Sequence, residues 1–253
     1  ASLLEAGVNR LSIGVQSFAE RDLALLGRIH NSSEAVDAIH SARQAGFANI
    51  SFDLMFGIPG QSLADWQANL RQAVSLEPDH LSLYSLILEP GRQLFDEVER
   101  GKIQPTSEDL SADMFELAMD MLVQEGYSQY EISNWARGEA FEARHNKIYW
   151  KNQPYLGVGA GAHSSLTGLR VANISSVEDY INKIRSLGSA SDISFPAAVE
   201  TLELDPYTVQ QETMMLGMRL TREGVSEFEF MNRFGKRILD VFPKEVDRII
   251  ARK

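Results

Sequence analysis

The chain has 253 residues, of which 44% are hydrophobic and 23% are charged, a composition typical of a globular protein with a sizeable core. Its 24 basic and 35 acidic side chains give a net charge of -11, which repels phosphate backbones and argues against nucleic acid as a partner. Cysteine is absent, which excludes disulfides, thiolate catalysis and any zinc or iron–sulfur site with cysteine ligands from these residues.

The apolar runs stop short of the roughly 18 residues that a membrane-spanning helix needs, and no charged-then-apolar leader opens the chain. We therefore expect no transmembrane segment and a cytoplasmic location. The first residues are ASLLEAG, without Met, which is typical of a helix that ends at a glycine. We expect the chain to be a fragment, and its last residues give no stop signal either.

The first half of the chain repeats one unit. Apolar runs at residues 10–15, 50–56 and 81–88 predict strands. They are separated by helical patterns that begin at Ser33 and Ser62, and a helix over 107–124 precedes a short strand around 129–132. This βαβ order predicts an α/β fold with a parallel sheet.

The strand residues indicate how the sheet closes. In residues 50–56, four apolar side chains share one face, and Ser51, Asp53 and Met55 share the other. One apolar face and one small or polar face favour a full or partial TIM-type barrel with ligand-binding residues at the carboxyl ends of the strands. Gln16 and Asp53 lie there.

Asp53 is the sharper candidate, because an ionised carboxylate in an apolar strand is costly without a partner. The residues leave open whether that partner is a ligand or the amides of a neighbouring loop. For Arg28, which follows the first strand, the alternative to a ligand contact is a solvated surface charge.

After residue 137 the periodicity breaks down. Amphipathic patterns at 178–187, 209–220 and 227–252 predict helices. We therefore divide the chain into a barrel domain at 1–137 and a smaller, mainly helical domain at 138–253.

Residues 130–163 concentrate potential ligands in a segment whose composition predicts irregular structure. It contains His145, Tyr149, Trp150 and His163. One interpretation is a capped turn with aromatic packing. The other is a flat apolar ligand stacked on Tyr149 or Trp150, with an imidazole available to a metal. The glycines at 157, 159 and 161 do not match a dinucleotide-binding fingerprint in spacing or context.

Several motifs together resemble the HemN/HemW branch of the radical S-adenosylmethionine (SAM) family. They are GVNRLSIGVQSF at 7–18, LGRIH at 26–30, FDLMFGIPGQ at 52–61 and YEISN at 130–134. The HNxxYW segment at 145–150 and GAGAHS at 159–164 resemble the HemW group, heme chaperones once taken for coproporphyrinogen III oxidases. The resemblance covers most of the chain.

This resemblance implies a partial (β/α) barrel that binds SAM over a [4Fe-4S] cluster. The family holds this cluster with a Cys-x3-Cys-x2-Cys loop, which we expect to lie outside this chain. Four matching residues inherit contacts with SAM: Gln16, Arg28, Asp53 and Ile87. The HNxxYW segment is associated with heme, so His145 becomes a candidate iron ligand, with Tyr149, Trp150 and His163 as further candidate heme contacts.

The resemblance leaves two active functions open. One is a heme chaperone that binds heme and SAM and delivers heme to acceptor proteins, membrane-associated ones included. The other is the oxygen-independent coproporphyrinogen III oxidase of heme biosynthesis. A barrel remnant without activity is the third interpretation. From this cysteine-free chain we expect no reductive cleavage of SAM.

Overall fold

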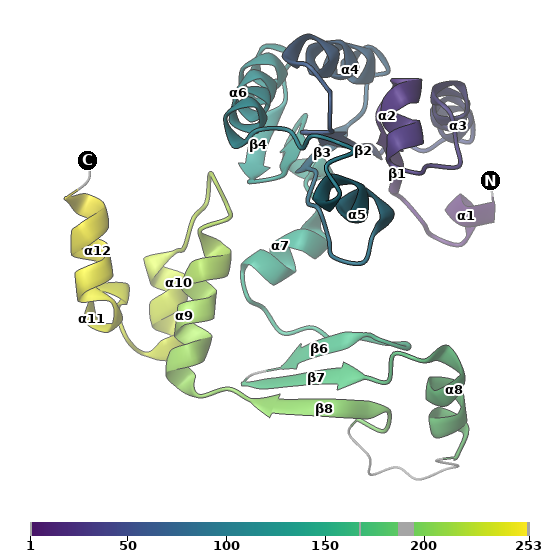
Figure 1. Cartoon of the computed structure of the whole chain (residues 1–253). Coiled ribbons are helices and arrows are strands. Elements are labelled where there is room, and N and C mark those ends of the chain that lie inside the picture. The colour runs from purple at the N-terminus through teal and green to yellow at the C-terminus, as the bar shows by residue number, and fades with distance from the viewer. Residues whose placement is uncertain (1, 167, 187–194, 252–253) are drawn as a thin grey trace. The chain divides into compact units, whose positions relative to one another are not determined.

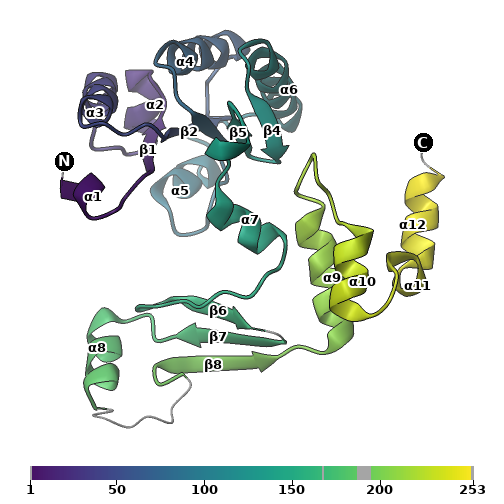
Figure 2. The same ribbon diagram turned by 180° about the vertical axis from the view of Figure 1, so that it is seen from behind.

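The structure is a computed structural model that describes residues 2–166, 168–186 and 195–251. Its contacts divide the chain into two compact units, Ala1–Glu142 and Ala143–Lys253. Figure 1 labels most elements of both units, and Figure 2 shows the same ribbon from behind. The proposed division into domains at 1–137 and 138–253 stays a prediction.

The first unit alternates strands and helices and then ends in a hairpin. Its elements are α1 (Ser2–Glu5), β1 (Leu11–Gln16), α2 (Glu20–Leu25), α3 (Ser32–Gln44), β2 (Ile50–Phe56), α4 (Leu63–Ser75), β3 (His80–Ser85), α5 (Gln93–Glu99), α6 (Glu108–Gln124), β4 (Ser128–Glu131), β5 (Asn134–Ala136) and the 3₁₀ helix η1 (Glu139–Phe141).

The strands form one sheet in the order β1-β2-β3-β5-β4. Strands β1, β2 and β3 are parallel, which confirms the predicted parallel α/β architecture. Strand β5 is antiparallel to both β3 and β4, so β4 runs in the same direction as the first three strands. The sequence did not predict β5, because a three-residue strand is too short to show an alternating pattern.

Side-chain caps fix where the main helices begin. Asn31 and Glu34 form a capping box at the start of α3, two residues before the expected Ser33. Ser62 caps α4 as predicted, in a second capping box with Asp65, and Ser107 caps α6. The third strand ends at Ser85, earlier than the predicted residue 88.

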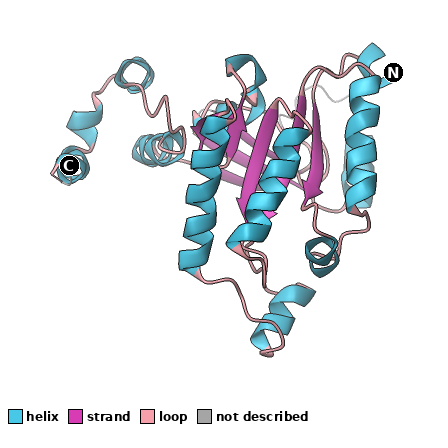
Figure 3. Cartoon of the chain, turned by 90° about the horizontal axis from the view of Figure 1, so that it is seen from above, coloured by secondary structure: helices cyan, strands magenta, loops and turns pink. Residues whose placement is uncertain are grey.

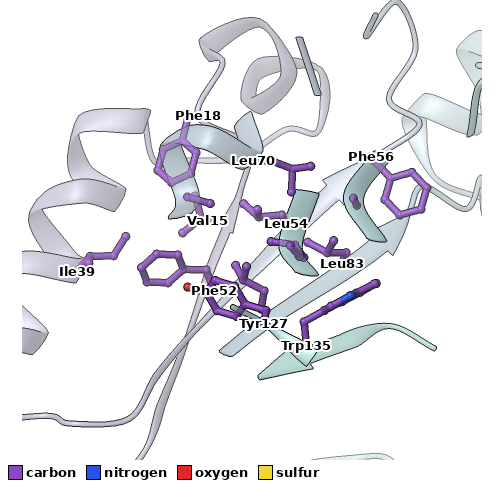
Figure 4. Close-up of a cluster of buried hydrophobic side chains, with 14 of the residues drawn as sticks. Val15, Phe18, Ile39, Phe52, Leu54, Phe56, Leu70, Leu83, Tyr127 and Trp135 are labelled. Carbon is purple, nitrogen blue, oxygen red and sulfur yellow. The ribbon is translucent and has the colours of Figure 1, made fainter. Parts of the chain in front are cut away.

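One face of the sheet forms the core of the first unit. Helices α3, α4 and α6 contribute side chains to this cluster and cover the apolar face (Figures 3 and 4). Phe52 and Leu54 of β2 are fully buried in it, as are Trp66 and Leu70 of α4. The indole of Trp66 also donates a hydrogen bond of 2.8 Å to the carbonyl of Met114, which ties α4 to α6.

The second unit combines helices with a small sheet. Its elements are α7 (Arg144–Trp150), β6 (His163–Leu166), β7 (Leu169–Asn173), α8 (Val177–Ser186), β8 (Ala198–Glu203), α9 (Pro206–Gly217), α10 (Glu227–Phe234), α11 (Ile238–Val241) and α12 (Pro243–Ile250). Strands β6, β7 and β8 pair antiparallel in that order. A small apolar cluster contains Phe230, Ile238 and Phe242.

The helices expected in this region are present, but the three strands were not predicted. Strand β8 is almost entirely exposed, so it lacks the apolar alternation that marks a half-buried strand. Helix α9 begins three residues before the expected start, because Asp205 caps it and Pro206 occupies its first turn. The expected helix ends at 187 and 252 lie outside the described residues.

Within the described ranges, no helix has the length and apolar composition that crossing a bilayer requires.

We predict that Leu70→Ala lowers the free energy of unfolding by roughly 2–5 kcal/mol, since it leaves a cavity at a fully buried position on α4. Leu63→Ala on the same helix is the control, because Leu63 is 38% exposed and should cost less than about 1 kcal/mol. Urea unfolding of both variants measures the difference. Equal losses would contradict the assignment of the core.

Candidate functional site

The face of the sheet opposite the core is polar. Alternation along β2 places Ser51, Asp53 and Met55 on this face. The parallel register sets them beside three residues of β3: Ser51 with His80, Asp53 with Ser82, and Met55 with Tyr84. Burial decreases along the strands, since His80 is 2% exposed and Tyr84 is 42% exposed. The polar face therefore opens toward the carboxyl ends, where ligands bind in parallel barrels.

Asp53 is half-buried at the centre of this face. Its carboxylate accepts hydrogen bonds from the Ser12 hydroxyl, at 3.0 and 3.2 Å, and from the Ser82 hydroxyl. Burial raises the pKa of Asp53, and the hydrogen bonds from Ser82 and Ser12 and the charge of Arg10 oppose that shift only in part. The partners are hydroxyls of neighbouring strands rather than loop amides, and the carboxylate remains a strong acceptor for a ligand.

A buried hydrogen-bonded chain lies deeper on the same face. The Ser51 hydroxyl is 2.7 Å from Nδ1 of His80, and Nε2 of His80 is 2.9 Å from the Tyr130 hydroxyl. Burial, and secondarily the charge of Arg10, lowers the pKa of His80 to about 3. The imidazole is therefore neutral at pH 7, with one ring nitrogen donating and the other accepting. The imidazole links β2, β3 and β4 at a more buried position of the polar face than Asp53 and Ser82.

Gln16 ends β1 in a left-handed backbone conformation, with φ of 66°. The register with β2 shifts between Ile13 and Gln16. Nε2 of Gln16 lies 2.9 Å from the position that a Cβ on Gly14 would occupy. The glycine thus leaves room for the Gln16 side chain on the polar face, and the strained residue stands at the carboxyl end of its strand.

Arg28 and Ile87 line one cleft of about 500 Å³ together with Met55. Helix α2 ends in a Schellman motif: Gly27 has φ of 64° and donates to the Ala24 carbonyl, and the amide of Arg28 donates to Leu23 at 2.9 Å. Both Arg28 and Ile87 are exposed. Because Met55 follows Asp53 on the same face of β2, the cleft adjoins the part of the polar face that carries Asp53.

His30 connects this cleft to β1. Its Nε2 donates to the carbonyl of Val15 at 3.2 Å, so the loop that carries Arg28 is tied to the residue before Gln16. The structure thus places Gln16 and Asp53 on the polar face and brings Arg28 and Ile87 together in the adjoining cleft. Their contacts with SAM stay a prediction. Ser12 and Ser82 could not be predicted as partners of Asp53 from the sequence, because serine is common on any small polar face.

Residues 145–150 lie on helix α7 of the second unit, and residues 128–136 form the β4–β5 hairpin of the first unit. Strand β4 confirms the short strand predicted around 129–132, whereas the expectation of irregular structure was wrong for residues 134–136 and 145–150. On the helix, His145 and Tyr149 are four residues apart, so their rings meet edge to face at 4.8 Å. Tyr149 contacts Tyr155 in the same way at 4.6 Å. His145 is exposed at the end of this row of rings.

Trp150 is held differently. The guanidinium of Arg219 stacks on its ring at 4.3 Å, so one face of the indole is occupied. The indole nitrogen of Trp150 is buried and has no hydrogen-bond partner among the described residues. A flat ligand would have to use the other face of the ring.

His163 is exposed on β6, after the glycine-rich segment. A Cβ at Gly157 would lie 2.1 Å from the carbonyl oxygen of His163, so the close backbone crossing explains this glycine without a ligand. The described ranges contain no cluster of three or more His, Asp or Glu side chains able to hold a metal ion.

Known proteins resemble this chain in both sequence and fold. The profile of the radical SAM superfamily matches residues 1–73. Heme chaperone HemW of Bacillus subtilis is 39% identical over 241 residues, which cover 95% of this chain and 61% of that protein. Heme chaperone HemW of Lactococcus lactis is 33% identical over 99% of this chain and 63% of its own length. The chain is a homologue of these HemW proteins, and its residues 1–73 are similar to the radical SAM superfamily.

The radical S-adenosyl methionine domain-containing protein 1 of mouse mitochondria is 35% identical over 97% of this chain and 56% of its own length. The chain thus spans less than two thirds of the length of these relatives. Among solved structures, the radical SAM enzyme coproporphyrinogen III oxidase (HemN) from Escherichia coli matches with a TM-score of 0.75. It is 20% identical, and the match covers 97% of this chain and 57% of that one. The predicted partial-barrel fold of the radical SAM type is confirmed.

The superfamily implies SAM and an iron–sulfur cluster, and the residues present fit the two differently. The half-buried Asp53 beside an open cleft suits the hydroxyl or ammonium donors of SAM. An iron–sulfur cluster needs thiolates, and this chain has no cysteine. These residues therefore do not fit the cluster.

We predict that acid destabilises this unit through His80. The pKa of an unfolded histidine is near 6.5 and that of His80 in the folded protein is about 3, so between these values the unfolded chain binds the extra proton. The loss of stability starts below about pH 6.5 and reaches at most about 2 kcal/mol at about pH 5.

The measurement is urea unfolding at pH 7 and pH 5 for the wild type and for His80→Gln, which retains a donor and an acceptor but does not titrate. The variant should lose less stability on acidification. His40→Gln, at an exposed position on α3, is the control and should behave as the wild type. The same loss in His80→Gln as in the wild type would show that His80 is not the group responsible.

Proposed function

We propose that this protein is a heme chaperone of the radical SAM superfamily. It binds SAM on the first unit and heme through the second, and it delivers heme to acceptor proteins, membrane-associated ones included, from a cytoplasmic location. The observation that carries the proposal is the HNxxYW segment on α7 with an exposed His145, in a chain 39% identical to a protein named heme chaperone HemW.

Each candidate residue of the polar face and the adjoining cleft recognises a different part of SAM. The Asp53 carboxylate accepts from hydroxyl or ammonium groups, and the Arg28 guanidinium pairs with the carboxylate of the methionine moiety. The Gln16 amide both donates and accepts, and Ile87 provides an apolar wall in the cleft. SAM supplies radical chemistry only with a reduced iron–sulfur cluster, so this chain alone holds the molecule without cleaving it.

We predict that Asp53→Asn weakens SAM binding about tenfold or more, because a charge-assisted hydrogen bond becomes a neutral one. The melting temperature should stay the same or rise, since the substitution removes a desolvated charge while its carbonyl still accepts from the serine hydroxyls. Isothermal titration calorimetry and thermal melts measure the two effects. Asp37→Asn, at an exposed position on α3, is the control for charge and should bind SAM as the wild type does.

Heme binding rests on His145. A neutral imidazole ligates iron, and the exposed position of His145 leaves its ring nitrogens accessible. Its contact with Tyr149, which in turn contacts Tyr155, restrains the ring. His163 is a second candidate ligand, and Tyr149 and the open face of Trp150 are candidate contacts for the porphyrin plane.

We predict that His145→Ala weakens heme binding about tenfold or more and shifts the Soret band, because an axial ligand is lost. The melting temperature should change by less than about 2 °C, since His145 is exposed. His163→Ala tests the second ligand, and His40→Ala, also exposed, is the control. An unaltered spectrum and affinity in His145→Ala would contradict the assignment of this ligand.

The alternative function, coproporphyrinogen III oxidase, has support only at the level of the fold, through the likeness to HemN at 20% identity. The two functions differ in the tetrapyrrole that they need: heme carries an iron for His145, and coproporphyrinogen III does not. Conversion of coproporphyrinogen III by the cluster-loaded whole protein would favour the oxidase.

A further inference from the structure

The second unit contains a pocket apart from the residues assigned above to SAM or heme. It lies between the end of α7, helix α9, the segment 218–226 and helix α10, and its volume is about 390 Å³. That size falls within the range of roughly 300–1,000 Å³ that small-molecule sites occupy. The lining includes Leu220, Val225, Phe230, Ser226, Glu229 and Arg233.

The pocket has an apolar floor and a charged rim. Leu220 and Phe230 are each 2% exposed, and Val225 is half-buried beside them. Ser226, Glu229 and Arg233, by contrast, are exposed. A ligand that matches this gradient has an apolar body and a polar or charged head group.

Arg233 is a cation of this pocket with no ionic partner among the described residues. In the described part of the chain no carboxylate lies within ion-pair distance of its guanidinium. Its contacts are a long hydrogen bond of 3.4 Å to the Lys151 carbonyl and the face of the Phe234 ring at 5.1 Å. Partial burial lowers the pKa of Arg233, and no neighbouring charge offsets this shift.

The surrounding charges limit the head group to one negative charge. Lys151 lines the pocket, but its ammonium pairs with Glu223 at 2.7 Å, and Glu223 also binds Lys147. Glu229 adds one carboxylate to the pocket wall. Among the lining residues, Arg233 and Lys151 are cationic and Glu229 is acidic, an excess of one positive charge that suits a carboxylate better than a doubly charged phosphate.

We propose that this pocket binds a small amphipathic monocarboxylate, with its apolar chain against Leu220, Val225 and Phe230 and its carboxylate on Arg233. Guanidinium and carboxylate match in a two-pronged hydrogen-bonding geometry. None of the lining residues is among those proposed above to contact SAM or heme.

The test uses octanoate with the purified chain, with neutral octanamide and cationic octylamine as matched probes. Methyl NMR signals of Leu220 and Val225 report on the pocket. Octanoate should shift these signals to saturation, and octanamide and octylamine should bind at least about tenfold more weakly. Equal binding of octanoate and octanamide would overturn the proposal, and so would shifts that do not saturate.

Variants then test the role of Arg233. Arg233→Gln should weaken octanoate binding about tenfold without affecting octanamide, and Arg233→Lys should retain part of the affinity because it keeps the charge. Glu229→Gln should strengthen octanoate binding, since it removes a like charge. Arg237→Gln, at an exposed arginine that pairs with Glu227 instead, is the control and should bind as the wild type does. Unchanged octanoate affinity in Arg233→Gln would also overturn the proposal.

Discussion

Hydrogen bonds from the hydroxyls of Ser12 and Ser82 to the Asp53 carboxylate join the parallel strands β1, β2 and β3 on the face opposite their apolar core. Helices cover the other face, so this sheet has two surfaces with different tasks. The apolar surface stabilises the first unit. The polar surface holds a partly desolvated carboxylate, which costs free energy in the absence of a ligand and is therefore a common feature of binding sites.

The buried end of the polar face holds the strands together, and the exposed end is the candidate binding site. At the amino end, His80 is neutral and fully bonded between Ser51 and Tyr130. At the carboxyl end, the face leads into a cleft lined by Arg28 and Ile87. The neutral imidazole holds three strands in register without adding a charge beneath Asp53. The candidate ligand groups thus rest on a layer of buried, hydrogen-bonded side chains, as preorganised sites require.

Strand and helix patterns were sufficient to predict much of the first unit, because its periodicities are strong. The strand over Ile50–Phe56 and the helix capped by Ser62 follow directly from alternation and from capping chemistry. Asp53 could also be predicted as a candidate ligand-binding residue, since a carboxylate interrupts an apolar strand. Its serine partners and the His80 chain were not visible, because they depend on the register between strands that are distant in sequence.

The second unit was harder to predict for two physical reasons. Its strands are short or exposed, so they lack a clear hydrophobic period. The aromatic residues of the HNxxYW segment have the spacing of one helical face, with His145 and Tyr149 in contact, but only seven residues form this helix. The sequence showed only that the glycine at 157 does not fit a dinucleotide fingerprint, and the structure explains this glycine by a close backbone crossing.

We propose that the polar face of the sheet, rather than another surface of the chain, binds SAM. A crystal structure of the chain grown with SAM tests this proposal most directly. We expect electron density for the ligand at the carboxyl ends of β1–β3, with a donor within hydrogen-bond distance of the Asp53 carboxylate and the methionine carboxylate near Arg28. Ligand bound elsewhere, with Asp53 still bonded only to its serines, would contradict it.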